Sequence, residues 1–367
     1  MRTYQSSLQF MSAIILSCCL AARLMALDVA APQTNQETNR ERLLLLLSGE
    51  WVSRGLYVAT KLEIADHLQT HPKSIEDLAH ATQSNPEALY RLLHMLAGFG
   101  IFEEVSPRVF SNTDTSCLLV KSNPDTLHAL TLWYGEDIHK SWEELLPSIQ
   151  TGTPAFELTF KQPVFSYLKE NPPRALLFQE AMKEKSMAVI KSALSTYDFT
   201  KFKSVYDIGG GYGQFMRALM QSHPDLHGVL FDLPEVIETI RERTPQLENN
   251  HCKLVSGDFF ESIPEGGDIY LLKSVLHDWD DEKSEKILKN CHQAMGPNSH
   301  LLIVEVVLQP KEHSIYANCM DVLMLAITGG KERSLASFKR MLENSGFVLE
   351  QVYPTATEFS ILKARKK

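Results

Sequence analysis

The sequence predicts an α/β fold in which a parallel sheet fills the C-terminal half and a mainly helical region precedes it. A short apolar strand at 204–208 runs directly into the glycine-rich turn 209–213 and then into a helix. Strand, glycine turn and helix form the repeating unit of nucleotide-binding parallel sheets. Residues 40–197, in contrast, carry apolar residues at helical spacing and one short extended pair. A length of 367 residues also favours two domains over one.

Composition excludes several classes of protein. Hydrophobic residues make up 44% of the chain and charged residues 22%, which is enough to bury a sizeable core and argues against a disordered protein. The net charge of −9 argues against a protein that wraps nucleic acid. The 6 cysteines show no CxxC and no metal-ligand spacing. We therefore expect reduced thiols, no metal site and a cytoplasmic location.

Residues 1–37 are predicted to be a leader that is signal-like or disordered. Arg2 and the apolar run 10–22 resemble the start of a secretory signal, and the run is too short to span a bilayer. Translation from Met11 or Met25 is the alternative interpretation. Because the thiols favour the cytoplasm, secretion or membrane targeting is the alternative location, and we expect no stable membrane association.

Residues 38–120 are predicted to form a winged helix. Two helices open at the N-caps Ser74 and Asn85, and an extended pair follows around Pro107. Winged helices can read DNA, but residues 58–120 contain four basic and eight acidic residues, a net charge of −4 that repels phosphate. We therefore predict no nucleic-acid partner and a homodimer formed through this domain, with its leucine-rich first helix buried against a second chain.

Residues 121–195 are predicted to be a helical linker with substrate-pocket helices. Apolar residues in 127–146 and 165–187 recur at helical spacing, and loops are expected at 151–154 and 171–173. Such aromatic residues and methionines usually belong to a core. The alternative is a pocket wall, because soft, flat side chains suit an aromatic ligand.

The segment 196–367 carries a cofactor motif. The turn 209–213 departs from the dinucleotide pattern, since Gln214 stands where the third glycine should be, and no phosphate-binding Gly-Lys-Ser/Thr is present. Asp207 would repel a pyrophosphate but suits the cationic amino-acid end of S-adenosylmethionine. Asp232, at the end of the next strand, can accept hydrogen bonds from both ribose hydroxyls. The sequence therefore predicts S-adenosyl-L-methionine as cofactor.

Four segments together resemble the small-molecule O-methyltransferases of the caffeic-acid and acetylserotonin type. They are residues 205–213, 231–237, 273–282 and 329–334, and their order and spacing agree with the family over roughly residues 40–365. The resemblance implies a Rossmann-like methyltransferase domain behind an N-terminal winged-helix dimerisation domain. It also implies methyl transfer to a hydroxyl of a small aromatic acceptor, whether phenolic, hydroxyindole or polyketide-like.

The resemblance also implies the residues of the site. His277 is expected to be the general base, at the end of a strand beside the cofactor turn, and Glu305 and Glu332 are expected to orient its ring. Glu305 stands alone in an apolar strand and needs a partner, for which we propose His277. The implied cofactor residues are Asp207, Gly209, Gly211, Gly213, Asp232, Asp258, Phe259, Lys273 and Ser186. The implied acceptor residues are Trp133, Phe165, Phe178, Met182, Asp278, Asp321 and Met324.

Two alternatives stay open on the sequence. The same fold and cofactor could serve a divergent reaction, such as decarboxylation or hydroxylation of an aromatic polyketide. A winged-helix DNA-binding regulator is the second. The acceptor is also open, because Ser274 replaces a tryptophan common in plant members and the stretch 324–332 is one residue shorter than theirs.

Overall fold

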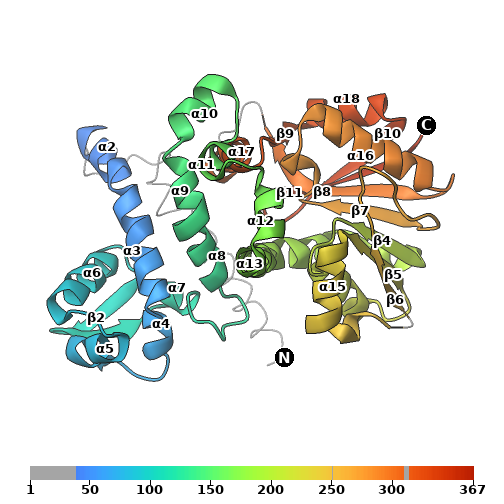
Figure 1. Ribbon diagram of the computed structural model, residues 1–367. Helices are drawn as coiled ribbons and strands as arrows, with labels where there is room; N and C mark the ends of the chain where they lie inside the picture. Colours follow the sequence, from blue (N-terminus) through green and yellow to red (C-terminus); the bar gives the residue numbers. More distant parts are fainter. Residues whose placement is uncertain (1–38, 250, 310–313) are drawn as a thin grey trace, which may run out of the picture. The chain divides into compact units, whose positions relative to one another are not determined.

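A computed structural model describes residues 39–249, 251–309 and 314–367 (Figure 1). The chain divides into two compact units between Gly135 and Glu136. The leader predicted at 1–37 lies outside the described residues. Among the helices that are described, none is long and apolar enough to cross a bilayer.

The first unit combines helices with a small antiparallel sheet of order β1-β3-β2, as a winged helix requires. Both predicted caps are confirmed: Ser74 Oγ accepts from the amide of Asp77 at 3.1 Å, and Asn85 Oδ1 accepts from that of Ala88 at 3.0 Å. The helices are α2 (Asn39–Leu47), α3 (Gly49–Lys61), α4 (Ile64–His67), α5 (Ile75–Thr82), α6 (Pro86–Gly98), α7 (Asp114–Cys117) and α8 (His128–Trp133). The strands are β1 (Lys73–Ser74), β2 (Phe102–Ser106) and β3 (Val109–Asn112).

Helix α2 exposes its leucines to solvent. Leu43, Leu44, Leu46 and Leu47 are each 50% exposed or more, and α2 buries no residue within the single chain. An exposed apolar surface of this kind is typical of a protein–protein contact.

The second unit begins with helices that precede the main sheet. A π-helix, Tyr134–Ile138, spans the division between the units. The sequence predicted a loop at 171–173, but Pro172 is the first residue of the long helix α13, because proline is favoured at that helical position. The helices are α9 (His139–Trp142), α10 (Leu145–Thr151), α11 (Ala155–Phe160), α12 (Val164–Glu170) and α13 (Pro172–Thr196).

The main sheet has the strand order β10-β11-β8-β7-β4-β5-β6, and β9 pairs with β8 off this path. Strands β8, β7, β4, β5 and β6 run parallel, whereas β11 and β10 are antiparallel additions at one edge. The five parallel strands were predicted from the sequence, and the two antiparallel ones were missed. The bounds are β4 (Ser204–Ile208), β5 (His227–Asp232), β6 (Cys252–Ser256), β7 (Ile269–Lys273), β8 (His300–Leu308), β9 (Arg333–Ser334), β10 (Phe347–Pro354) and β11 (Phe359–Lys366).

Helices cover both faces of this sheet (Figure 1). One apolar cluster joins the sheet to α13, α14, α15 and α17, and the other joins it to α16 and α18. Because β4 has β5 on one side and β7 on the other, the strand order reverses there, and ligands bind at the carboxyl ends of such strands. The Rossmann-like fold is thus confirmed. These helices are α14 (Gln214–Ser222), α15 (Pro234–Arg243), α16 (Asp281–Ala294), α17 (Ile315–Ile327) and α18 (Leu335–Asn344), and short 3-10 turns are η2 (Phe199–Lys201), η3 (Pro245–Leu247) and η4 (Leu276–Asp278).

Candidate active site

The glycine-rich turn exposes bare backbone at the carboxyl end of β4. Gly209, Gly211 and Gly213 have φ angles of +69°, +55° and +73°, a region that other residues enter only with strain. A Cβ atom on Gly210 would lie 2.3 Å from Leu230 Cδ1, so a side chain has no room there. The turn therefore offers the close backbone approach that a cofactor needs.

Two carboxylates flank this turn. Asp232 accepts from the amides of Gly211 at 2.7 Å and Leu233 at 2.8 Å, which orients it at the end of β5. Asp207 is 2% exposed, and its Oδ2 atom has no hydrogen-bond partner within the described part of the chain. A buried carboxylate oxygen without a partner beneath a glycine turn fits a cationic ligand such as S-adenosylmethionine.

Burial changes the acidity of both carboxyls. It raises the pKa of Asp207 to about 7, although the positive charge of Lys273 opposes this shift. It raises the pKa of Asp232 to about 6, against the two amide hydrogen bonds. Both groups are therefore poised to lose a proton when a cation or hydroxyl donors arrive.

The other predicted cofactor residues come together at the same edge of the sheet. Lys273 Nζ donates to Ser186 Oγ at 3.1 Å, which joins the end of β7 to α13. A Cβ atom on Gly209 would meet a Phe259 ring atom at 3.4 Å, so this ring borders the turn. Asp258 is held by the amide of Phe260 at 2.7 Å. These contacts support the predicted grouping but leave each role a prediction.

A buried histidine lies between two buried glutamates. His277, in η4, is 6% exposed, and its Nδ1 atom lies 2.9 Å from Glu332 Oε1 and 3.5 Å from Glu305 Oε2. Its Nε2 atom lies 3.9 Å from Asp278 Oδ1. The partner proposed for Glu305 from the sequence is thus in contact with it. Both glutamates bind the Nδ1 side of the ring, so Nε2 is the nitrogen left for chemistry.

Glu305 also organises the backbone beside His277. Its Oε1 atom accepts from the amides of Val275 at 2.9 Å and Leu276 at 3.0 Å. The chain bends there because Ser274 adopts a φ of +53°, in the left-handed region. A carboxylate in an apolar strand is costly without partners. Here Oε1 has two amide donors, whereas Oε2 has no hydrogen-bond partner within the described residues and lies 3.5 Å from Nδ1 of His277.

Burial also raises the pKa of the acids around His277. The pKa of Glu332 reaches about 8, with Lys185 opposing the shift, and that of Asp278 reaches about 6. The pKa of Glu305 is raised for the same reason. Glu332 and Asp278 therefore change their protonation states at about pH 8 and about pH 6.

The histidine and the two glutamates are also close enough together to ligate a metal ion, because one ligand atom from each lies within 4.8 Å of the others. Glu305 Oε1 is already used by two backbone amides. Nδ1 of His277 is engaged by Glu332 at hydrogen-bond distance. This arrangement suits a proton between acids and an imidazole, and the absence of a metal site stays a prediction.

The predicted acceptor residues divide into several groups. Phe165 stacks on Trp279 with ring centroids 5.5 Å apart, and Phe178 meets Phe165 edge-on at 6.5 Å. Asp321 Oδ1 accepts from the amide of Glu332 at 2.9 Å, so it helps to hold the segment that carries Glu332. Met324 is buried and Met182 is half-buried. Trp133 is buried in the first unit, and its role stays a prediction.

Sequence reasoning assigned no role to Trp279 or Arg333. Trp279 follows His277 by two residues and also packs edge-on against Phe260, with centroids 4.8 Å apart. Trp279 lies within residues 273–282, one of the segments that resemble the family, and that position could have indicated a functional role. Arg333 is buried and donates to the carbonyl of Leu276, next to His277, and nothing in its local sequence indicates which groups it contacts.

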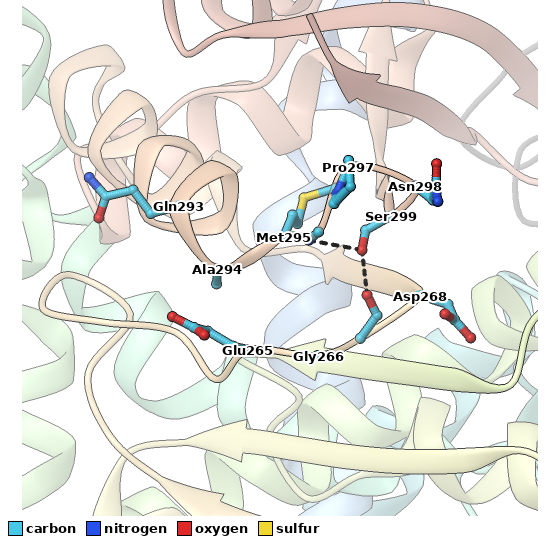
Figure 2. A pocket seen from close by; sticks show the side chains of 11 residues that line it. Glu265, Gly266, Asp268, Gln293, Ala294, Met295, Pro297, Asn298 and Ser299 are labelled. Atoms are coloured by element: carbon cyan, nitrogen blue, oxygen red, sulfur yellow. Dashed lines mark hydrogen bonds between the residues drawn. The ribbon is translucent and has the colours of Figure 1, made fainter.

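A pocket elsewhere on the sheet is distinct from this site (Figure 2). It is lined by residues 265–268 and 293–299, which precede β7 and β8. Ser299 Oγ donates to the carbonyl of Gly267 at 2.6 Å and accepts from the amide of Gly296 at 3.2 Å, as the dashed lines show. The pocket lies at the amino ends of the strands, whereas the glycine turn and His277 follow carboxyl ends.

Comparison with known proteins identifies the family. The profile of the O-methyltransferase domain matches residues 142–348. The chain belongs to the O-methyltransferase family. This O-methyltransferase also matches the profile of the O-methyltransferase dimerisation domain over residues 44–122. The family predicted from the four sequence segments is therefore confirmed, and the winged-helix segment is a dimerisation domain.

Individual relatives agree with this assignment. This O-methyltransferase is 40% identical to a phenazine O-methyltransferase of Lysobacter antibioticus, covering 88% of this chain and 95% of the relative. It is 32% identical to a phenazine-1-carboxylate N-methyltransferase of Pseudomonas aeruginosa, covering 88% and 96%. The structure of human N-acetylserotonin methyltransferase with S-adenosylmethionine superposes with a TM-score of 0.84 at 25% identity, covering 91% and 99%. The protein is an S-adenosylmethionine-dependent O-methyltransferase, as the sequence predicted.

Proposed function

We propose that this O-methyltransferase methylates a hydroxyl of a small aromatic acceptor and that His277 is the general base. The observation that carries the proposal is the imidazole held on its Nδ1 side by two buried glutamates, at the sheet edge that carries the glycine turn. S-adenosylmethionine supplies a methyl group on a sulfonium that an oxygen can attack in line. The chain's own residues must then align that oxygen and remove its proton.

The glutamates determine which nitrogen acts as base. When Glu332 is ionised it can only accept a hydrogen bond, so Nδ1 of His277 then carries the ring proton and donates a hydrogen bond to Glu332 Oε1. The neutral ring then presents a lone pair at Nε2, which takes the hydroxyl proton. Glu305 and Glu332 stabilise the imidazolium that results.

The cofactor would be held by the acids and glycines at the ends of β4 and β5. Asp232 would accept from the ribose hydroxyls, and Asp207 would face the cationic amino-acid end. Phe259 and Asp258 would contact the adenine, and the Lys273–Ser186 pair would lie beside it. The orphaned Oδ2 atom of Asp207 supports this placement.

Aromatic packing supports an aromatic acceptor. Phe165, Phe178 and Trp279 form one contiguous group of rings in the same unit as the base. Flat rings favour offset or edge-on contacts with a further aromatic ring. Two of the relatives are named after phenazine and N-acetylserotonin, and both of these compounds are aromatic as well.

We also propose a cytoplasmic homodimer built through residues 38–120, with no nucleic-acid partner. The match to the dimerisation profile and the exposed leucines of α2 support this proposal. Residues 121–195 would then supply linker and pocket helices, and 196–367 the methyltransferase domain.

The test is a product screen with S-adenosylmethionine and a panel containing 1-hydroxyphenazine, phenazine-1-carboxylate and simple phenols. Mass spectrometry detects methylated products, and NMR locates the methyl group on oxygen or nitrogen. We expect O-methylated phenols. The His277→Ala variant should lose about 10²-fold or more in kcat while still binding S-adenosylhomocysteine.

The matched control is His71→Ala, which removes an exposed histidine of the first unit and should leave kcat unchanged. Full turnover by His277→Ala with cofactor binding intact would remove His277 as the base. Products methylated only on nitrogen would contradict the hydroxyl acceptor.

A further inference from the structure

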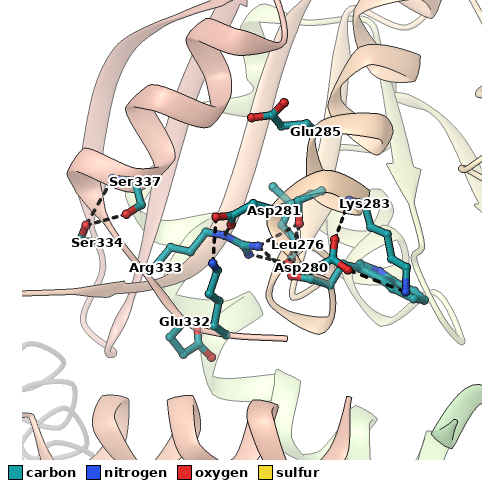
Figure 3. Close-up of polar contacts among 12 residues, drawn as sticks. Leu276, Asp280, Asp281, Lys283, Glu285, Glu332, Arg333, Ser334 and Ser337 are labelled. Carbon is teal, nitrogen blue, oxygen red and sulfur yellow. Dashed lines mark hydrogen bonds and ion pairs between the residues drawn. The ribbon is translucent and has the colours of Figure 1, made fainter. Parts of the chain in front are cut away.

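A buried arginine contacts the backbone on both sides of His277. Arg333 is 2% exposed, and its Nη1 atom donates to the carbonyl of Leu276 at 2.7 Å. Its Nη2 atom donates to the carbonyl of Trp279 at 2.7 Å and to Ser284 Oγ at 3.1 Å. Figure 3 shows the guanidinium directed at the segment that carries the base. One planar guanidinium thus donates hydrogen bonds to backbone carbonyls before and after the histidine.

The residues just before Arg333 bind the carbonyl of His277 itself. The amide of Lys331 donates to it at 2.9 Å. A Cβ atom on Gly330 would lie 1.9 Å from the same oxygen, so only glycine permits this approach. Segment 330–333 therefore holds the carbonyls of Leu276, His277 and Trp279 together.

Segment 330–333 also carries Glu332, the nearer acid of the pair that binds His277. The base and this acid are 55 residues apart in the chain and stand on two segments that meet only in the fold. The distance between Nδ1 and Oε1 depends on how those segments dock. Arg333 donates hydrogen bonds to Leu276, Trp279, Asp281 and Ser284 across that junction, and Glu332 is its neighbour in the chain.

The partners of Arg333 distinguish it from an ordinary buried ion pair. Its sole ion-pair partner within the described residues is Asp281, whose side chain is 46% exposed and which also binds Lys331 Nζ at 2.8 Å. The buried donors are aimed at carbonyls that flank the base. Buried charges are ordinarily paired with an opposite charge that is buried with them, and Asp281 is not buried.

We propose that Arg333 is a positioning residue that sets the orientation of His277 relative to Glu332 and to the acceptor oxygen. The proposal rests on the base role proposed for His277. Arginine suits the task because its planar fork directs several donors at fixed angles, whereas lysine offers one point charge on a flexible stem. A displacement of the imidazole by about 1 Å can cost about 10²-fold in rate.

The experiment compares Arg333→Lys with Arg241→Lys. Arg241 binds an acid, Glu248, and a backbone carbonyl, that of Leu254, just as Arg333 does, but on α15. We expect Arg333→Lys to lower kcat by about tenfold or more while the Kd of S-adenosylhomocysteine stays within about twofold. The pH profile of kcat and the imidazole NMR signal of His277 should both shift. The Arg241 variant should change none of these.

Asp281→Asn provides a second variant, because the side chain of Asp281 is 46% exposed and its replacement leaves the apolar core intact. It removes the charge that Arg333 Nε contacts at 3.0 Å and should lower kcat by about threefold, with the same shift in the His277 signal. An unchanged kcat and pH profile in both variants would overturn the proposal. Equal losses of cofactor binding and kcat would overturn it too, because they indicate a merely structural role.

A parallel assay of His277→Ala separates this proposal from the proposed function. If His277→Ala retains turnover, the base assignment fails whatever Arg333→Lys does. If His277→Ala loses turnover while Arg333→Lys and Asp281→Asn keep the wild-type profile, the base assignment stands and the positioning role alone fails.

Discussion

The Nδ1 atom of His277 lies 2.9 Å from Oε1 of Glu332, and both side chains are buried. Burial raises the pKa of Glu332 to about 8, with Asp321 contributing in the same direction. Glu332 therefore changes its protonation state near pH 8, and that change decides whether it donates a hydrogen bond to Nδ1 of His277 or accepts one from it. The reactivity of Nε2 depends on the direction of this hydrogen bond.

The first prediction concerns pH. Below a pH of about 8, Glu332 carries a proton that it can donate in a hydrogen bond to Nδ1 of His277, so the ring's own proton lies on Nε2 and Nε2 has no free lone pair. Above it, Nδ1 donates to ionised Glu332 and Nε2 is free. We expect kcat/KM to rise with pH and level off near 8, measured with initial rates. Glu332→Gln should lower kcat and shift the pH at which kcat/KM rises. A wild-type kcat/KM that does not change with pH would contradict the role of Glu332 in controlling Nε2.

The second prediction separates the two roles of Glu305. Glu305→Leu leaves the buried amides of Val275 and Leu276 without an acceptor, at a cost of about 1–3 kcal/mol each in the free energy of unfolding. Glu305→Gln keeps an acceptor oxygen and should lose much less stability, yet lower kcat about tenfold because it cannot stabilise an imidazolium. Urea unfolding and steady-state kinetics measure the two effects. Equal stability of both variants would argue against the amide contacts.

The third prediction concerns metals. His277, Glu305 and Glu332 are close enough to ligate an ion, but their contacts suit proton sharing. We expect dialysis against EDTA to leave kcat unchanged. Loss of activity that returns on adding one divalent metal would show that this cluster is a metal site.

The fourth prediction links cofactor binding to protons. Asp207 and Asp232 have pKa values raised by burial to about 7 and about 6, so both carry protons at low pH in the free protein. A bound cation and ribose hydroxyls favour the ionised forms, so binding releases protons. We expect the affinity for S-adenosylmethionine to fall about tenfold from about pH 8 to about pH 6, measured by calorimetry. Asp207→Asn should bind more weakly and lose most of this dependence.

The sequence was sufficient for the features that are local. The strand before the glycine turn, the caps at Ser74 and Asn85, and the acid inside the apolar strand β8 each follow from neighbours a few residues away. The resemblance then placed His277, Glu305 and Glu332 in one site, and the structure brings them into contact.

Long-range contacts were not predictable in the same way. Arg333 lies 57 residues from Leu276, and no periodicity connects the two. The stacking of Trp279 on Phe165 joins the residues after η4 to α12, and no local sequence pattern indicates that contact. The edge strands β10 and β11 were missed although they pair with each other and β11 pairs with β8. Strand β10 carries Glu350 and Gln351 at its centre and its register shifts there, so its sequence lacks the regular apolar alternation that indicates a strand.

The fifth prediction tests the dimer surface. Leu46 and Leu47 of α2 are 60% and 65% exposed in the single chain, and burying a leucine contributes about 1.5–3 kcal/mol. The double variant Leu46→Gln, Leu47→Gln should therefore weaken a homodimer by about 10²-fold or more. Sedimentation velocity over a range of concentrations measures the change. Leu335→Gln, at a comparably apolar but 40% exposed site on α18, is the control and should leave the dimer intact. A double variant that dimerises like the wild type would place the interface on another surface.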